Sequence, residues 1–257
     1  MTDKPLFAAA ILMAAMAFAG SRAAAADIKV LTAGAFKQIV VALAPEFEKQ
    51  TGHKLIIENE TVGALVKKIE GGEAFDVTFL SPAAVDGLIK QGKIADGSRV
   101  NIARVGVGVM VKEGAPKPDI STVEAFKKAV LAAKSVSYID PASGGSSGVY
   151  VAKLLEQLGI ADQVRPKQKL KQGGYVADLI ASGEAELGIH QISEIVPHKG
   201  VTLVGPLPKE IQNYTTYAAG VAGATKDKDA ATALVTFLSG PRTAEILKSK
   251  GMEPAGS

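Results

Sequence analysis

The chain has 257 residues, of which 47% are hydrophobic, so it is long enough to bury one large core or two smaller ones. Its 29 basic and 26 acidic residues nearly balance, which argues against a nucleic-acid groove or a polybasic membrane surface. Because there is no cysteine and there are only three histidines, we expect no disulfide and no metal site. We also expect no cofactor, no nucleic-acid partner and a monomeric chain.

The first 26 residues have the pattern of an export signal. Lys4 precedes an apolar run, 6–20, that is short for a membrane span, and the small residues 24–26 suit signal peptidase. No cysteine follows the run, so a lipoprotein anchor is excluded. We expect a signal peptide, 1–26, cleaved before Asp27, and a mature protein located in the periplasm.

Residues 28–40 begin as a strand and end as a helix, with a glycine where the two meet. The apolar residues of 28–31 fit a buried strand, and helical periodicity starts at Phe36. Free N–H groups at a helix start, together with the helix dipole, form a site for anions. We therefore expect Ala35, Phe36 and Lys37 to bind a ligand through backbone N–H groups and one positive charge.

The same arrangement follows along the chain. A strand is expected at 54–57, and a polar turn leads from it into a helix at 64–70; a third strand is expected at 75–80. Parallel strands of this kind end at one edge of a sheet, and ligands of open α/β sheets bind outside that edge. The residues expected to bind a ligand at the second junction are Thr61, Val62 and Gly63.

Two long segments rich in β-forming residues, 100–112 and 214–224, are interrupted by glycines and exceed what one small sheet requires. We interpret them as crossings between two lobes. The predicted architecture is an α/β fold with lobe I at 27–105 plus 218–257 and lobe II at 106–217. Two such lobes bind a ligand by closing about a hinge.

The loop 140–148 is the most informative stretch of the second lobe. It follows an expected strand at 135–139 and precedes an expected helix at 149–158. Its glycines let the backbone approach a ligand, and Ser146 and Ser147 bring hydroxyl groups to the helix start. Simple helix capping by one serine is the alternative, but the loop is longer than capping requires, which favours binding.

The expected strand at 185–191 is apolar except at its end, where His190 and Gln191 stand. His190 is either an ordinary core histidine or a functional one, and the sequence leaves both open. The other expected elements are helices at 123–133, 175–182, 228–238 and 240–250 and a strand at 201–204.

The order and spacing of five motifs carry a family resemblance. The motifs lie at 30–36, 47–52, 64–76, 140–141 with 148–150, and 182–189. Together they resemble the periplasmic molybdate-binding protein family of ABC importers, over essentially the whole mature chain. The resemblance implies a type II periplasmic binding protein fold with a ligand cleft and two crossover strands, a small anionic ligand, and an ABC permease partner in the inner membrane.

The chain departs from this family at the ligand site. Where members of this family have two serines, this chain has Ala35 and Val62, and where they have a tyrosine it has Gln191. The family's backbone N–H donor in the second lobe corresponds to Ser147. Each unmatched charged partner costs about 1.5–3 kcal/mol, so molybdate is disfavoured. The nearby Lys37 favours an organic carboxylate instead.

Two functions follow from the resemblance. The first is a substrate-binding protein of an ABC importer that takes up a small anion. The second is a periplasmic aconitate isomerase that interconverts trans- and cis-aconitate, because 31–37 and 58–61 are similar to an aconitate isomerase of this same binding-protein family. For that reaction the candidates for proton transfer are Lys37, Glu60 and His190.

Overall fold

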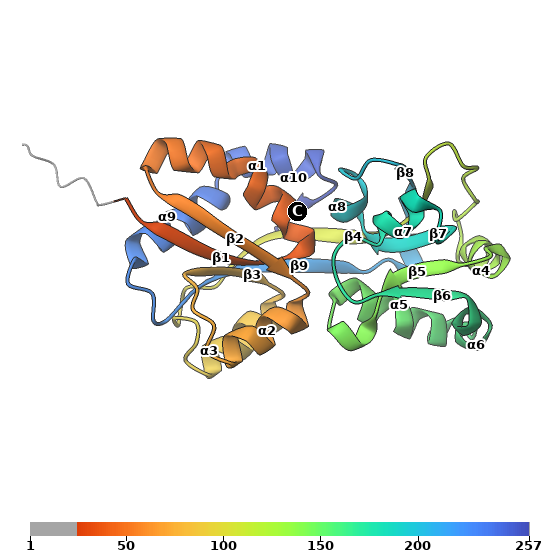
Figure 1. Cartoon of the computed structure of the whole chain (residues 1–257), viewed down its shortest axis with the longest axis horizontal. Coiled ribbons are helices and arrows are strands. Elements are labelled where there is room, and N and C mark those ends of the chain that lie inside the picture. The colour runs from red at the N-terminus through yellow and green to blue at the C-terminus, as the bar shows by residue number, and fades with distance from the viewer. Residues whose placement is uncertain (1–24, 257) are drawn as a thin grey trace, which may run out of the picture.

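The computed structural model describes residues 25–256, so the predicted signal peptide lies almost entirely outside the described residues. Figure 1 shows two α/β lobes side by side, with two long strands, β4 and β9, running between them. Helices cover both faces of the sheet in each lobe. The predicted α/β class is therefore confirmed.

Lobe I is built on a sheet with the order β2-β1-β3-β9-β4. β1 is parallel to β2 and β3, and β9 is antiparallel to β3 and β4. The bounds are β1 Asp27–Ala33, β2 Lys54–Glu60, β3 Val77–Leu80, β4 Val100–Lys112 and β9 Tyr214–Val221, with the short β10 Glu253–Pro254 paired to β4. The carboxyl ends of the three parallel strands thus share one edge, as predicted.

Two layers of helices enclose the lobe I sheet because its strands are apolar on both faces. Val30 packs into a core with α1, α9 and α10, whereas its neighbour Leu31 packs into a second core with α2 and α3. Successive strand residues point to opposite faces, which explains this division. The helices are α1 Gly34–Thr51, α2 Val62–Glu70, α3 Pro82–Lys90, α9 Lys228–Leu238 and α10 Pro241–Ser249.

Lobe II repeats the plan with a smaller sheet. Its strands are β5 Val136–Ile139, β6 Gln168–Lys171, β7 Leu187–Gln191, β8 Val201–Pro206 and the second half of β4. One face packs on α4 Val123–Ala132, α5 Ser146–Gln157 and α6 Ala161–Val164, and the other on α7 Ala177–Ser182 and α8 Ile192–Ile195. Three 3-10 turns complete the lobe: η1 Pro141–Ser143, η2 Arg165–Lys167 and η3 Lys209–Ile211.

The crossing from lobe I to lobe II occurs within β4. Val100–Gly106 pairs with β9, and from Val107 onward the strand pairs with β7. The Gln212 side chain accepts the Val107 N–H and donates to the Val107 carbonyl, both at 2.9 Å. This side chain therefore completes the backbone hydrogen bonds where the strand changes partner. The predicted lobe boundaries, at 105/106 and 217/218, stay a prediction.

Most predicted elements occur where the sequence pattern put them, with differences at their ends. β2 continues to Glu60 instead of ending at residue 57, and α5 starts at Ser146 instead of residue 149. Several short elements were missed, among them α6, β10 and the 3-10 turns, and two of them, β6 and α8, show why. β6 is a polar edge strand without an apolar alternation, and α8 is a single turn, too short for a helical period to register.

Candidate functional site

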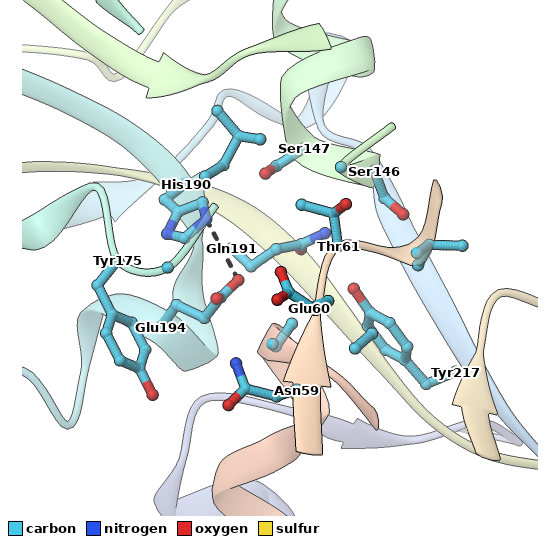
Figure 2. Close-up of a pocket in the computed structure, with 17 residues that line it drawn as sticks. Asn59, Glu60, Thr61, Ser146, Ser147, Tyr175, His190, Gln191, Glu194 and Tyr217 are labelled. Carbon is cyan, nitrogen blue, oxygen red and sulfur yellow. Dashed lines mark ion pairs between the residues drawn. The ribbon is translucent and has the colours of Figure 1, made fainter. Parts of the chain in front are cut away.

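A cavity of about 40 Å³ lies between the two lobes, at the carboxyl ends of the strands (Figure 2). Its lining comes from both lobes and from elements far apart in the sequence. The lining residues are Ala33, Gly34, Ala35, Asn59, Glu60, Thr61, Val62, Ile139, Gly145, Ser146, Ser147, Gly174, Tyr175, His190, Gln191, Glu194 and Tyr217. Residues of the two lobes hydrogen-bond to each other beside this small space.

The start of α1 faces this cavity from lobe I. Its N-cap residue, Ala33, has no side-chain oxygen and makes no capping hydrogen bond, and Gly34 and Ala35 line the cavity. The first N–H groups of a helix have no partner within the helix. The α1 start therefore offers donors and a partial positive charge to the cavity.

The start of α5 faces the same cavity from lobe II. Its N-cap, Gly145, makes no side-chain capping bond, and Ser146 and Ser147 are the first two helical residues. Gly148 holds the helix close to β5, because a Cβ there would lie 2.2 Å from the Ile139 carbonyl oxygen. Two helix starts without side-chain caps thus meet at one cavity.

Hydrogen bonds between the lobes close the mouth of the cavity. The Thr61 hydroxyl donates to the Ser143 carbonyl at 2.6 Å, and the Gly63 N–H donates to the Gly144 carbonyl at 3.2 Å. The two glycines touch through their backbones, since a Cβ on Gly63 would lie 2.9 Å from the Gly144 Cα. The Thr61 oxygen also accepts the Ala64 N–H and so caps α2.

Two further hydrogen bonds join α1 to lobe II. The Gln38 amide donates to the Tyr175 hydroxyl at 2.9 Å, and the Ser193 hydroxyl donates to the Ala35 carbonyl at 2.8 Å. The second bond docks α8 against the first turn of α1. The start of α1 is therefore fixed in position relative to residues of both lobes.

A buried pair, His190 and Glu194, forms part of the cavity floor (Figure 2). His190 Nε2 lies 3.3 Å from Glu194 Oε2, and the side chains are 2% and 8% exposed. Burial raises the pKa of Glu194 to about 8 and lowers that of His190 to about 3, with Lys171 adding to the second effect. Both groups are therefore uncharged at neutral pH, because burial disfavours either charged form.

Two further buried polar groups complete the floor. Burial raises the pKa of Tyr217 well above its ordinary value, with Glu194 adding to the effect and a hydrogen bond to Ser146 opposing it. The Gln191 amide donates to Thr215 Oγ1 at 3.0 Å, while its Oε1 has no hydrogen-bond partner within the described residues. A buried polar atom of this kind is a place where a bound molecule can form a hydrogen bond.

The structure brings most of the sequence-predicted site residues to the cavity. Those in its lining are Ala35, Thr61, Val62, Ser146, Ser147 and Gln191, together with the proton-transfer candidates Glu60 and His190. Gly63 lies at the mouth. Lys37 and Phe36 are not in the lining: Lys37 is half-buried on α1, and Phe36 packs in the lobe I core, 4.7 Å from the Phe79 ring. The expected lysine charge is thus not part of the cavity wall.

Sequence reasoning missed Glu194 and Tyr217, which line the floor, and Asn59 and Tyr175, which lie nearer the edge (Figure 2). A signal for Glu194 was present, because an acidic residue stands among the apolar residues Ile192, Ile195 and Val196, four positions after His190. Such a residue in a buried segment indicates a satisfied or functional acid. Tyr217 gave no comparable signal, since aromatic residues are common in strands.

Within residues 25–256, no cluster of three or more His, Cys, Asp or Glu side chains is arranged to hold a metal ion. None of the helices described there combines the length and the apolar character needed to span a bilayer.

The two lobes, the paired crossover strands and the enclosed cavity define a solute-binding protein. Residues 28–253 match the model of the family described as bacterial extracellular solute-binding protein, and the chain belongs to this family.

Curated relatives include proteins with two different names. An aconitate isomerase from Pseudomonas sp is 32% identical over 233 residues, which cover 88% of this chain and 87% of the relative. The molybdate-binding protein ModA of Azotobacter vinelandii is 30% identical over 237 residues, covering 89% of this chain and 90% of that protein. The predicted resemblance to the molybdate-binding family is therefore confirmed.

Solved structures share the fold. The periplasmic molybdate-binding protein of Azotobacter vinelandii superposes with a TM-score of 0.74 at 23% identity, covering 88% of this chain and 98% of that one. The sulfate-binding protein SubI of Mycobacterium tuberculosis H37Rv gives a TM-score of 0.72 at 19% identity, covering 90% of this chain and 87% of that one. The predicted periplasmic binding protein fold is thus confirmed.

Proposed function

We propose that this chain is a periplasmic receptor that closes on a small anion and presents it to an ABC permease in the inner membrane. The observation that carries the proposal is that two uncapped helix starts, those of α1 and α5, face one enclosed cavity from opposite lobes. Their N–H groups and dipoles favour an anion without any lysine or arginine in the wall. The family membership supports the same function.

We further propose that the ligand is an organic carboxylate, not molybdate. A tetrahedral dianion carries charge on every side, whereas an organic carboxylate carries it only on its carboxylate groups and presents uncharged carbon atoms elsewhere. Glu60 and Glu194 line the cavity together with the helix starts, so a ligand that directs its charge only towards the helix starts suits the wall better. Ala35 and Val62 also offer methyl groups where the resemblance places serine hydroxyls.

A calorimetric and thermal-shift screen tests the proposal. The panel is molybdate, tungstate, sulfate, phosphate, lactate, citrate and trans-aconitate, because a ligand of the native state raises the melting temperature. We expect Ser147→Ala to weaken the binding of a carboxylate roughly tenfold to a hundredfold, the loss typical of a hydrogen bond to a charged group. Ser239→Ala, at the C-cap of α9 and outside the cavity lining, is the matched control and should leave affinity unchanged.

Failure of every member of the panel to bind would contradict a small-anion receptor. Tight binding of molybdate alone would keep the receptor but overturn the carboxylate assignment. We also expect Thr61→Val to weaken binding, because it removes the hydroxyl that bonds the Ser143 carbonyl across the mouth.

The second candidate function is isomerisation of aconitate, and one observation favours it. Two carboxyl groups in different environments line the same cavity: Glu60 is solvent-exposed, and Glu194 is buried next to His190. An allylic shift of a double bond needs a base that removes a proton from one carbon and an acid that returns one to another. Pairs of acids in unlike environments suit that division of roles.

Incubation with trans-aconitate in D₂O, followed by NMR, tests this candidate. An isomerase yields the cis isomer with deuterium at the carbon that is protonated. Loss of turnover in Glu60→Gln, Glu194→Gln and His190→Gln would support the assignment. Binding of trans-aconitate without conversion would contradict the isomerase and keep only the receptor function. Lys37, the third candidate from the sequence, is not in the cavity wall, so Lys37→Ala should have little effect on turnover.

A further inference from the structure

Glu194 occupies a special position on the cavity floor. It is 6% exposed, and a Cβ built on Gly34 would lie 2.7 Å from its Oε1, so the carboxyl group packs against the first residue of α1. The Ser193 bond to the Ala35 carbonyl fixes the short helix α8 in this place. The carboxyl group and the uncapped N–H groups of α1 therefore face the same part of the cavity.

Among residues 25–256, none of those that line the cavity beside Glu194 carries a permanent positive charge. Its nearest ionisable partner is His190, which burial keeps uncharged, and no lysine or arginine is in the described lining of the cavity. From α1 it faces the backbone at Gly34. The other titratable groups around it are Tyr217 from β9, Tyr175 before α7 and Glu60 from β2, with Lys171 of β6 acting on the histidine.

We propose that Glu194 acts as a carboxylic acid that donates its proton in a hydrogen bond to a carboxylate oxygen of the ligand, beside the N–H groups of α1. This inference rests on the carboxylate-binding function proposed above and identifies its specificity residue. At hydrogen-bonding distance an ionised Glu194 would repel the ligand carboxylate, whereas the acid form attracts it. The residue thus selects ligands that accept a hydrogen bond at this point.

The proposal makes binding dependent on a proton. Burial raises the pKa of Glu194 to about 8, so the acid form predominates below that pH and the carboxylate above it. At higher pH the bound complex must recover the proton from solvent, because the ligand binds only the acid form. Affinity is therefore full below about pH 8 and falls roughly tenfold per pH unit above it.

Titration calorimetry at pH 6 and pH 9, in pairs of buffers with different ionisation enthalpies, tests the proposal on the full mature chain. The probes are lactate, citrate and trans-aconitate. At pH 9 we expect uptake of up to about 0.9 proton per ligand bound, and at pH 6 almost none. Glu194→Gln, which keeps an N–H donor but cannot titrate, should bind with equal affinity at the two pH values. Asp178→Asn, outside the cavity, should retain the pH dependence of the unmodified chain.

The outcomes separate two failures. If none of the three carboxylates binds at pH 6, the proposed carboxylate function is wrong, and the role of Glu194 falls with it. If a carboxylate binds with equal affinity and no proton uptake at pH 6 and 9, the function stands and the role of Glu194 is wrong. That role is also wrong if Glu194→Gln keeps the full pH dependence, or if the chain binds amines and not carboxylates, since an ionised Glu194 would then be the partner.

Discussion

Two histidine–acid pairs in lobe II have the same chemistry and opposite environments. His190 and Glu194 are 2% and 8% exposed, with 3.3 Å between Nε2 and Oε2, whereas His198 and Asp178 are 22% and 49% exposed, with 2.9 Å between Nε2 and Oδ1. Burial raises the pKa of Glu194. Burial also acts to raise that of Asp178, but hydrogen bonds from Lys171 and His198 outweigh it and the pKa is lowered.

The difference shows that residue type alone does not decide the charge of such a pair. Solvent and a neighbouring lysine stabilise the charged acid in one pair, and their absence favours the neutral acid in the other. The exposed pair is an ordinary surface contact between a histidine ring and an ionised aspartate. The buried pair faces a cavity, where a neutral acid can act as a donor.

The largest effect is expected from Glu194→Gln, which should stabilise the fold. Folded Glu194 keeps its proton up to about pH 8, whereas the unfolded residue releases it near its ordinary pKa of 4.5. The free energy of unfolding therefore decreases as the pH rises from 4.5 to 8. At pH 8 we expect a gain of about 2–5 kcal/mol in the free energy of unfolding, measured in urea.

The gain should shrink by about 1.4 kcal/mol for each pH unit below 8. Asp178→Asn provides the comparison and should show no such gain. Equal stability of the variant and the unmodified chain at pH 8 would mean that Glu194 is charged in the folded state.

A second effect concerns His190 below neutral pH. Burial holds the pKa of folded His190 at about 3, below its ordinary 6.5, so the unfolded state takes up a proton first as pH falls. Stability from this group is present above pH 6.5 and is lost on acidification. We expect a loss of about 2 kcal/mol between pH 6.5 and 5, measured in the Glu194→Gln background, where the opposing contribution of the acid is removed.

His190→Gln in that background should abolish this loss. His198→Gln, which alters the exposed pair, should leave it in place. A loss that disappears in His198→Gln and persists in His190→Gln would reverse the assignment of the two pairs.

A smaller effect tests the packing of Glu194 against α1. Gly34→Ala places a Cβ 2.7 Å from Glu194 Oε1, in a buried site where the carboxyl group has little room to move. We expect a destabilisation of about 1–3 kcal/mol by thermal unfolding. Combined with Glu194→Ala, which removes the obstructing atoms, most of this cost should disappear.

Gly87→Ala is the matched control because Gly87 also lies in a helix but has no atom within 4 Å of its added Cβ. It should gain up to about 1 kcal/mol from helix propensity. Equal effects of the two substitutions would show that Glu194 does not press on the start of α1.

The smallest effect is expected at the exposed pair. Asp178→Asn should change the free energy of unfolding by less than about 1 kcal/mol, because exposed ion pairs are weak and screened. Urea denaturation at low and at high salt measures it. A larger loss that survives high salt would indicate that this pair, and not only the buried one, supports the closed cleft.

Much of the fold was predictable from the sequence. Apolar periods located the helices α1, α4 and α9, and the glycine-interrupted segment at 100–112 indicated a strand that serves both lobes. These features were predictable because they depend only on the order of neighbouring residues in the sequence. β6 and α8 were not predictable because one is a polar edge strand and the other a single turn, both held by tertiary contacts.

The position of the candidate cavity was predictable from the sequence, and the chemistry of its wall less so. Helix starts after strands identified the regions around Ala35, Thr61 and Ser147, since topology places them at one edge. The direction of a side chain was not visible, and so Lys37 was expected in the wall and Glu194 was not. The pKa of Glu194 depends on burial by both lobes, which no local pattern encodes.

The lobes can meet at Gly63 and Gly144 only because neither residue has a side chain. Gly144 has φ of 71°, which disfavours any other residue, and a Cβ there would press on the Gly63 Cα, an atom that cannot swing aside. A single methyl group at either position would prevent the two backbones from touching and would keep the two lobes apart. Such a variant would hold the open form, the state that a solute must meet first.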